Sequence, residues 1–408
     1  MSEKQIPVRT ALMPAYYKDF HCIMGACQDN CCDDGWRIEF SKKDYLAVKR
    51  AARSDELKQM VEQSLGRLNE RAHGKMYAEF HQSEEGRCAF HTPEGLCRLQ
   101  LECGEGVLPN VCRTYPRGTI YTSAALEYAL SPSCEGVLAL LWDLKDGVDF
   151  IEEPLPKEKH RIYWTKNPME ARFSAVRALW IDALQARALP LSRRFLLLGL
   201  MSQQLMGLDW QDASTLDHAL LQWQVLLQNP DSLVKSLEKM PGNQQMFISN
   251  NVYLLFKLLK ALGSELVAEL LSAATGETSL EALNLSRISA NTEYYQNLEN
   301  KLDEFLNHSE HFLENLMVSI VFQMVLPSLD TPQDLWKSYV ELCNLYSFYR
   351  FSAVCSMDKE VSRARLFHAV VRASRALVHD QSQRIKLQDE LFKNDSATLA
   401  HMAILVGG

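Results

Sequence analysis

The 408-residue sequence lacks the features that would assign it to a membrane or to a nucleic acid. Its first ten residues contain no apolar segment of the kind found in signal peptides, so we expect a cytoplasmic protein. The most apolar run, residues 316–326, is far shorter than the ~20 residues that span a bilayer, and it predicts a buried core helix. The net charge of -8 provides no basic surface for nucleic acid or anionic lipid. We therefore expect neither as a partner.

Repeats of fixed period and low-complexity tracts are also missing, whereas cysteine is concentrated in one region. Nine of the eleven cysteines lie between residues 22 and 134. Thiolates are soft ligands for zinc, copper(I) and iron-sulfur clusters, and reducing conditions in the cytoplasm disfavour disulfides. The density therefore predicts a bound metal or cluster. We call two groups the first cysteine block (Cys22, Cys27, Cys31, Cys32) and the second cysteine block (Cys88, Cys97, Cys103, Cys112), and Cys134 follows alone.

Turn and strand signals between the cysteines predict how they are brought together. Residues 93–95, Pro-Glu-Gly, suit a tight turn that would place Cys88 beside Cys97. Pro116 disfavours the helical region for Tyr115, so the chain should become extended soon after Cys112. Residues 119–121 and 126–130 look like the arms of a hairpin that returns residues 131–135 to the cysteines. Further predictions are a Ser41-capped helix, helices over 55–69 and 98–102, and strands over 36–40 and 76–80.

Beyond residue 150 the pattern changes to helical periodicity. Residues 151–157 are charged and punctuated by proline, which we interpret as a linker. Apolar residues then recur at helical spacing in stretches separated by Pro190, Pro230, Pro241, Gly276 and Pro327. The predicted fold class is mainly α. An N-terminal cysteine-rich metal-cluster domain with short strands and hairpins (1–150) precedes a larger all-helical domain (155–408). Cys343 and Cys355 stand alone in helical stretches and are interpreted as small buried hydrophobic residues.

The order of these motifs resembles the flagellin lysine-N-methylase (FliB) family. The matching features are Cys-x4-Cys-x3-Cys-Cys, a Gly-Leu-Cys turn, Cys-x-x-Tyr-Pro-Arg and Leu-Ser-x-x-Cys-Glu, all within residues 13–142, with a weaker helical block at 314–327. More loosely, the region is similar to small zinc- or iron-chelating cysteine-cluster proteins. The family resemblance implies methyl transfer from S-adenosylmethionine to lysine side chains of flagellin, and a 4Fe-4S cluster held by the N-terminal cysteines. Zinc is the alternative metal.

The resemblance also selects residues. The cysteines that fall where the family has cysteine are Cys22, Cys27, Cys31, Cys32, Cys88, Cys97, Cys112 and Cys134, whereas Cys103 does not. A 4Fe-4S cluster takes four thiolates, so either a second centre exists or some of the eight thiols are structural or catalytic. The catalytic residues and the S-adenosylmethionine pocket are not identifiable by motif. Tyr115, Arg117 and Glu135 are candidates because they are near the cysteines and match the family.

Two motifs of other methyl-transfer enzymes are missing. The Cys-x3-Cys-x2-Cys motif of radical S-adenosylmethionine enzymes fails at Asp34, which favours a polar transfer. The Gly104-x-Gly106 pair has neither a third glycine nor a preceding strand, so a nucleotide-binding sheet is not supported. Three functions remain open: a protein-lysine methyltransferase, a metal-chelating or metal-delivery protein, and a zinc-stapled interaction module. The oligomeric state is not predicted.

Overall fold

The chain is described from a computed structural model, in which it forms two compact units. Unit 1 consists of Met1–Asp19, Thr119–Ser133 and Leu138–Gly408, and unit 2 of Phe20–Gly118 and Cys134–Val137. These bounds differ from the expected domains, because the segments around residues 10, 126 and 150 belong to the helical unit. The described residues are 5–7, 10–32, 38–68, 76–83, 86–122, 125–155, 161–163, 168–229, 243–276, 292–306 and 310–407.

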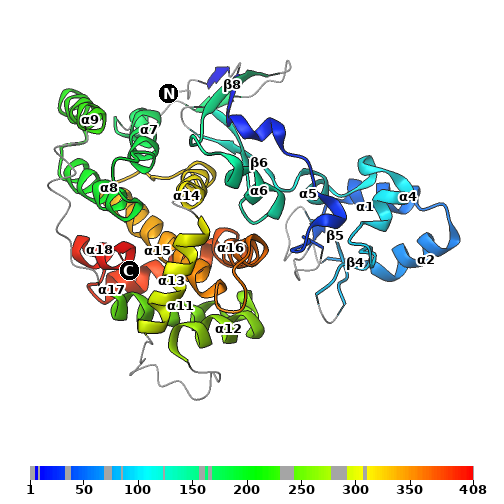
Figure 1. Cartoon of the computed structure of the whole chain (residues 1–408). Helices are drawn as coiled ribbons and strands as arrows, with labels where there is room; N and C mark the ends of the chain where they lie inside the picture. The colour runs from blue at the N-terminus through cyan, green and yellow to red at the C-terminus, as the bar shows by residue number, and fades with distance from the viewer. Residues whose placement is uncertain are drawn as a thin grey trace. The chain divides into compact units, whose positions relative to one another are not determined.

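Unit 1 is mainly helical, as the periodicity predicts (Figure 1). The helix-ending Gly276 adopts a left-handed conformation directly after α12, which is common where a helix stops. No helix of the described part is both long and apolar enough to cross a membrane. The helices are α7 (Phe173–Leu184), α8 (Leu191–Met206), α9 (Ala213–Gln228), α11 (Gln244–Leu262), α12 (Ser264–Thr275), α13 (Thr292–Leu306), α14 (His311–Gln323), α15 (Pro332–Ser356), α16 (Arg363–Val378), α17 (Gln381–Lys393) and α18 (Leu399–Gly407), with short 3-10 turns at Ala15–Asp19 and Glu170–Arg172.

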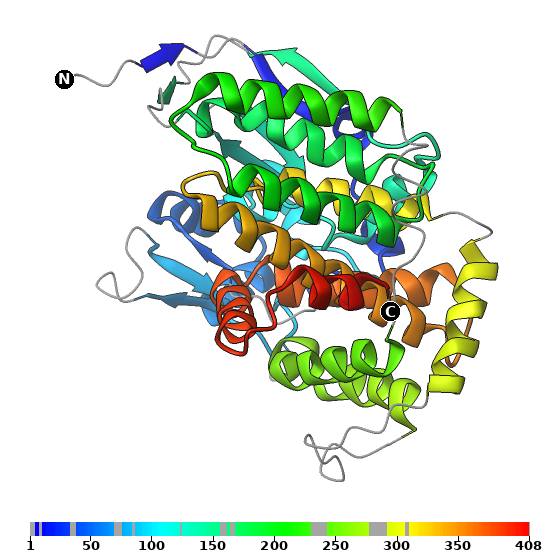
Figure 2. The ribbon, with the colours of Figure 1, turned by 90° about the vertical axis from the view of Figure 1, so that its left-hand side faces the viewer.

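Helix α15 is the central element of unit 1. Thr331 caps it, because its hydroxyl accepts the amide of Asp334 at 3.3 Å, and Pro332 occupies the first turn, where no amide hydrogen is needed. The helix contacts α8, α16 and α18, and Figure 2 shows it running between α8 and α18. Cys343 and Cys355 lie on it and are fully buried, which agrees with their interpretation as core residues.

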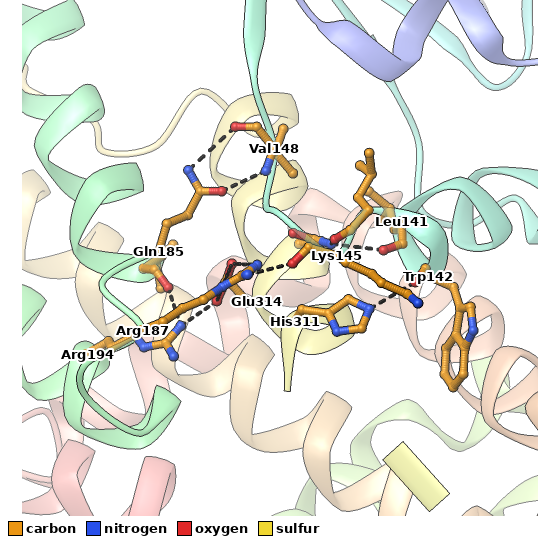
Figure 3. Close-up of polar contacts among 12 residues, drawn as sticks. Leu141, Trp142, Lys145, Val148, Gln185, Arg187, Arg194, His311 and Glu314 are labelled. Carbon is orange, nitrogen blue, oxygen red and sulfur yellow. Dashed lines mark hydrogen bonds and ion pairs between the residues drawn. The ribbon is translucent and has the colours of Figure 1, made fainter. Parts of the chain in front are cut away.

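The predicted core helix near residues 316–326 is confirmed as α14, which ends at Gln323 and is buried from Phe312 to Phe322. Its buried Glu314 receives hydrogen bonds from Arg187 at 2.8 Å and from Arg194 at 2.6 Å (Figure 3). Arg194 is itself buried, so the carboxylate is compensated inside the core. A buried charge is tolerated only with such partners.

The next residues of α14 hold the end of α6 (Glu135–Asp143). The Asn315 amide donates to the carbonyls of Leu141 at 2.9 Å and Leu144 at 2.7 Å, and His311 lies 2.9 Å from the carbonyl of Trp142. These carbonyls are among the last four of a helix, which have no partner within the helix itself. The contact explains why polar residues stand in an otherwise apolar helix.

A small sheet completes unit 1. Strand β2 (Thr10–Pro14) pairs in parallel with β7 (Leu126–Leu130) and antiparallel with β8 (Phe150–Pro154), and β6 (Arg117–Tyr121) lies beside β7. The hairpin predicted over residues 119–130 is therefore confirmed. Arg177 of α7 donates to both carboxylate oxygens of Glu127, and both side chains are buried, so the sheet is fixed to the helices.

Residues 151–154 are not the linker that their composition suggests, because they belong to β8. The strand lies at the edge of the sheet, where proline is tolerated and charged side chains face water. A second, two-stranded sheet pairs β1 (Gln5–Pro7) with β9 (Arg161–Tyr163), so the helical region begins with one short strand. Residues 156–160 lie outside the described part.

Unit 2 has shorter elements. Ser41 accepts the amide of Asp44 at 3.2 Å and caps α1 as predicted, whereas the helix predicted over 55–69 ends at Ser64 because residues 65–67 pair with β5. Its core includes Phe80, whose ring contacts those of Phe40 and Phe90. The elements are α1 (Lys42–Ala51), α2 (Asp55–Ser64), α4 (Arg98–Cys103), α5 (Asn110–Thr114), β3 (Glu39–Phe40), β4 (Leu65–Arg67), β5 (Ala78–Phe80) and 3-10 turns at Met24–Ala26 and Glu105–Val107, and Trp36 and Arg37 of the predicted strand lie outside the described residues.

Candidate functional site

The first cysteine block is a loop held by backbone contacts. A 3-10 turn, Met24–Ala26, separates Cys22 from Cys27. Gly25 lies against the turn of the second block so closely that a Cβ there would meet the carbonyl oxygen of Glu94 at 2.6 Å. A side chain at residue 25 would push the two segments apart. Glycine is required at residue 25 because the Glu94 carbonyl lies so close, and not because of the backbone angles of Gly25.

Asn30 joins the two blocks. Its amide nitrogen donates to the carbonyl of Gly95 at 2.9 Å, and its oxygen accepts the amide of Cys32 at 2.9 Å. The amide of Cys88 in turn donates to the carbonyl of Cys32 at 2.7 Å. Sequence reasoning missed this residue. The signal available was an asparagine directly before a Cys-Cys pair, since asparagine side chains often bond to backbone groups two residues away.

The predicted turn in the second block is present. The amide of Gly95 donates to the carbonyl of Thr92 at 3.0 Å, and Gly95 has φ 76°, which favours glycine. His91 and Cys97 face each other in an antiparallel bridge, so Cys97 lies opposite a residue three positions after Cys88. Cys97 then precedes α4, the short helix expected over 98–102.

Three thiols of the second block, those of Cys88, Cys97 and Cys112, interact electrostatically with Cys31 or Cys32. Burial raises the pKa of Cys112, and negative charge on Cys88, Cys97 and Cys31 would raise it further. A hydrogen bond with Cys31, followed by burial, raises the pKa of Cys32. The raised pKa values favour the protonated thiols of Cys32 and Cys112 unless a cation is bound.

Cys31 also links this group to the remaining cysteines. Burial raises the pKa of Cys134 to about 11, and Cys31 and Cys22 act in the same direction. Burial, then Glu135, Cys134 and Cys31, raise the pKa of Cys27. All eight cysteines selected by the sequence are thus brought into one unit, with Cys31 in electrostatic contact with members of both blocks. All eleven cysteines are thiols rather than disulfides.

The other three cysteines are placed differently. The Cys103 thiol donates to the carbonyl of Ala51 at 3.4 Å and packs against the apolar core of unit 2. Cys343 and Cys355 lie in unit 1. Cys343 and Cys355 are thus separated from the eight, whereas Cys103 lies in unit 2 with them and packs against the same apolar core as Cys97 and Cys112.

Thiols in this number fit the donor chemistry of zinc or of an iron-sulfur cluster, since a soft cation converts them to thiolates and releases their protons. Suitable donor chemistry does not by itself place the side chains around a common point. Within the described residues, no three Cys, His, Asp or Glu side chains form a group that could hold a metal ion. Residues 33–37, which include Asp33 and Asp34 next to Cys32, lie outside that part.

Glu135, a catalytic candidate, contacts the first cysteine block. One carboxylate oxygen accepts the amides of Gln28 at 2.7 Å and Asp29 at 3.1 Å, and the Cys27 thiol lies 3.4 Å from the same oxygen. Glu135 is also the first residue of α6, where the positive end of the helix dipole stabilises a carboxylate. The contacts give it a positioning role for the loop that carries Cys27.

The other two candidates follow α5. The Arg117 guanidinium donates to the carbonyl of Phe20 at 2.9 Å and lies over the Phe20 ring at 4.9 Å. Tyr115 ends the helix with an extended backbone, as Pro116 predicts. Arg117 therefore holds the chain just before the first cysteine block.

Comparison with known proteins identifies the family. The model of the FliB lysine N-methylase C-terminal domain matches residues 177–405, which is more than half of the chain. The chain belongs to the FliB lysine N-methylase family. The match begins within α7 and ends within α18, so it rests on the helices of unit 1, including the weaker block at 314–327, rather than on the cysteines of unit 2.

The individual proteins of known name that resemble this chain share low sequence identity with it. Two proteins named lysine-N-methylase, from Salmonella choleraesuis and Salmonella typhimurium, are 27% and 28% identical over 150 and 153 residues, in each case 36% of this chain and 36% of the relative. The flagellar biosynthetic protein FliU of Salmonella muenchen is 27% identical over 143 residues, 34% of this chain and 80% of FliU. The alignments thus span about a third of the two methylases. No solved structure matches the chain.

Proposed function

We propose that this FliB-family protein is a lysine N-methyltransferase that transfers methyl groups from S-adenosylmethionine to lysine side chains of flagellin. The observation that carries the proposal is the match of the FliB lysine N-methylase domain over residues 177–405. The names of the relatives, lysine-N-methylase and flagellar biosynthetic protein, support the reaction and the flagellar substrate. Flagellin is accordingly the proposed partner, and the cytoplasm the proposed location.

The transfer is proposed to be polar. The lysine nitrogen attacks the methyl carbon, the carbon–sulfur bond of the sulfonium breaks, and the electron pair stays on sulfur as S-adenosylhomocysteine forms. The ammonium product releases its proton to a base or to water. The attacking amine must be neutral, although lysine normally titrates near ~10.4, so the substrate lysine has to be desolvated or deprotonated where it binds.

The proposed cofactor of unit 2 is a 4Fe-4S cluster, with zinc as the alternative. Eight thiols in one unit supply the donor chemistry for a thiolate-bound centre, although the described side chains form no group of three that could hold a metal ion. Asn30, Glu135 and Arg117 hold the segments that carry these thiols. When bound, such a centre would supply a soft cation that makes the thiols ligands and ties the two cysteine blocks together. The function of these three residues is thus to position the cysteine-bearing loops.

Anaerobic purification followed by methylation separates the alternatives. We expect a brown sample with broad visible absorption, and a mass gain on flagellin lysines after mixing with S-adenosylmethionine. A colourless, zinc-loaded sample that still methylates would retain the enzyme and replace the cluster. Absence of mass gain with folded, metal-loaded protein would contradict the methyltransferase and favour a metal-chelating or zinc-stapled interaction protein.

A further inference from the structure

Cys134 is carried by a chain segment, residues 131–143, that helices of the matched family domain hold at both ends. The segment ends with α6, whose last carbonyls are bound by Asn315 and lie near His311 of α14. The first residues of the segment contact α16. Both ends therefore belong to unit 1, although Cys134 itself belongs to unit 2.

Two buried serines make the contact with the end of α16. The hydroxyl oxygens of Ser131 and Ser133 lie 2.7 Å apart, and both residues are buried. Nε2 of His379, the residue after α16, lies 2.7 Å from the Ser133 hydroxyl and 3.5 Å from that of Ser131. Because buried hydroxyl groups are found with hydrogen-bond partners, His379 fixes the two serines in the interior.

A second contact with α16 fixes the peptide bond that precedes Cys134. Nε of the buried Arg375 donates to the carbonyl oxygen of Ser133 at 3.3 Å. This oxygen shares a planar peptide unit with the amide nitrogen and the Cα atom of Cys134. The carbonyl oxygen of Cys134 in turn accepts the amide of Val137 at 3.0 Å. The backbone of Cys134 is thus held on both sides, and its thiol moves mainly by rotation about the Cα–Cβ bond.

The residue after Cys134 extends this constraint to the first cysteine block. The carboxylate of Glu135 accepts the amides of Gln28 at 2.7 Å and of Asp29 at 3.1 Å, directly after Cys27. A displaced backbone at Cys134 would move this carboxylate, and with it the loop that carries Cys27.

We propose that Ser133, Arg375 and His379 are positioning residues for the Cys134 thiol, so that α16 sets the geometry of the cysteine site. The match to the FliB domain covers α16 but does not reach the cysteines of unit 2, and this contact links the two parts of the chain. The inference rests on the proposed function in one respect, which is that Cys134 is a ligand of the proposed metal centre.

Alkylation of the purified full chain with iodoacetamide, measured for each cysteine by mass spectrometry, tests the position of the thiol. His379→Leu should raise the rate at Cys134 at least threefold and leave the rate at Cys88 unchanged, because thiol reactivity depends on the local surroundings. His379→Gln keeps a nitrogen that can bond to Ser133, so it should restore the native rate. The matched control is His218→Leu, since His218 is exposed on α9 and bonds to Gln222.

Ser133→Ala removes the hydroxyl from the other side of the same contact. We expect it to raise the rate at Cys134 as His379→Leu does, and the double variant should react no faster than either single variant, because both changes break one interaction. Additive effects would show that the two residues act separately and would overturn the inference. An equal rise at Cys134 and Cys88 also overturns it, since that result shows general loosening.

The visible absorption of the metal-loaded chain is the second measurement, with cobalt(II) exchanged for zinc in a colourless sample. Groups that orient a ligand alter the spectrum of its metal, whereas a loss of stability elsewhere does not. His379→Leu and Ser133→Ala should shift the absorption bands, and His379→Gln should give the native spectrum. A native alkylation rate or a native spectrum in both of the first two variants overturns the inference.

Failure of the proposed function is seen separately. Native protein that adds no methyl group to flagellin, but whose alkylation at Cys134 depends on His379, contradicts the methyltransferase and supports the positioning role. A chain that binds no metal contradicts the proposed cofactor, and the alkylation rates then decide the inference alone.

Discussion

The two units are stabilised in different ways. Unit 1 buries apolar faces of long helices, and its buried charges, such as Glu314 with Arg187 and Arg194, are paired inside the core. In unit 2, α4 has six residues and α5 five, well below the ~12–15 at which an isolated helix becomes even marginally stable. Unit 2 therefore depends on its small apolar core and on contacts between loops, and we expect the proposed metal centre to add to them. The comparison indicates that metal should matter to one unit and not to the other.

Removing a proposed ligand should break unit 2 selectively, and this is the largest effect we expect. Cys97→Ser should lower bound metal by at least half and reduce protection of unit 2 in hydrogen exchange, because a hydroxyl is a poor ligand for a soft metal. Cys103→Ser is the matched control, since Cys103 bonds to a carbonyl instead. Equal loss of metal in the two variants would contradict the division of the cysteines.

A charge deletion should break unit 1 instead. Glu314→Ala leaves Arg194 buried without its carboxylate partner, so we expect the free energy of unfolding of unit 1 to fall by about 3–5 kcal/mol in denaturant titration. Metal content should not change. Asp217→Ala removes an exposed partner of Arg172 and should have little effect. If Asp217→Ala lowered the free energy of unfolding as much as Glu314→Ala, burial would not determine how much an ion pair contributes to stability.

The smallest effect concerns pH. Burial, aided by the charges of Arg375 and Arg384, lowers the pKa of His379 to about 4, and its Nε2 lies 2.7 Å from the Ser133 hydroxyl. Unfolded histidine titrates near ~6.5, so as pH falls from about 6.5 toward 4 the unfolded state gains a proton that the folded state does not. Stability of unit 1 should therefore decline over this window and be fully present above it.

Replacing His379 should flatten that decline. His379→Asn keeps a hydrogen-bonding side chain near Ser133 but cannot titrate, and we expect a shallower fall in melting temperature between pH 6.5 and 4.5. The effect should be modest because His379 is exposed at the surface, where solvent weakens the influence of burial on its pKa. An identical pH profile in the variant and the native protein would show that another group controls it.

Sequence patterns predicted the local elements well where a single physical signal dominated. Ser41, Pro116 and the Pro-Glu-Gly turn ending at Gly95 each specify a cap or turn through their own chemistry, and each is found as predicted. Residues 151–154 were misread because charge and proline are typical of linkers. An edge strand tolerates the same composition, and only the pairing with β2 distinguishes the two.

The candidate site shows the same division. Spacing and resemblance selected eight cysteines and set Cys103 apart. All nine lie in unit 2, so the division between Cys103 and the other eight stays a prediction. The hydrogen bonds of Asn30 to Gly95 and of Glu135 to the amides near Cys27 could not be predicted from sequence, because they join residues 65 and about 107 positions apart. Nothing in a local pattern records such a contact.

The sequence by itself therefore determined the helical periodicity of unit 1, the caps and turns, and the concentration of thiols, because each depends on residues within a few positions of one another. Only the tertiary structure decided that residues near 10, 126 and 150 form one sheet, that Glu314 is neutralised by two arginines, and that Arg375 and His379 hold the residue before Cys134. These features depend on burial and on pairing between distant segments, and both arise only when the whole chain is folded.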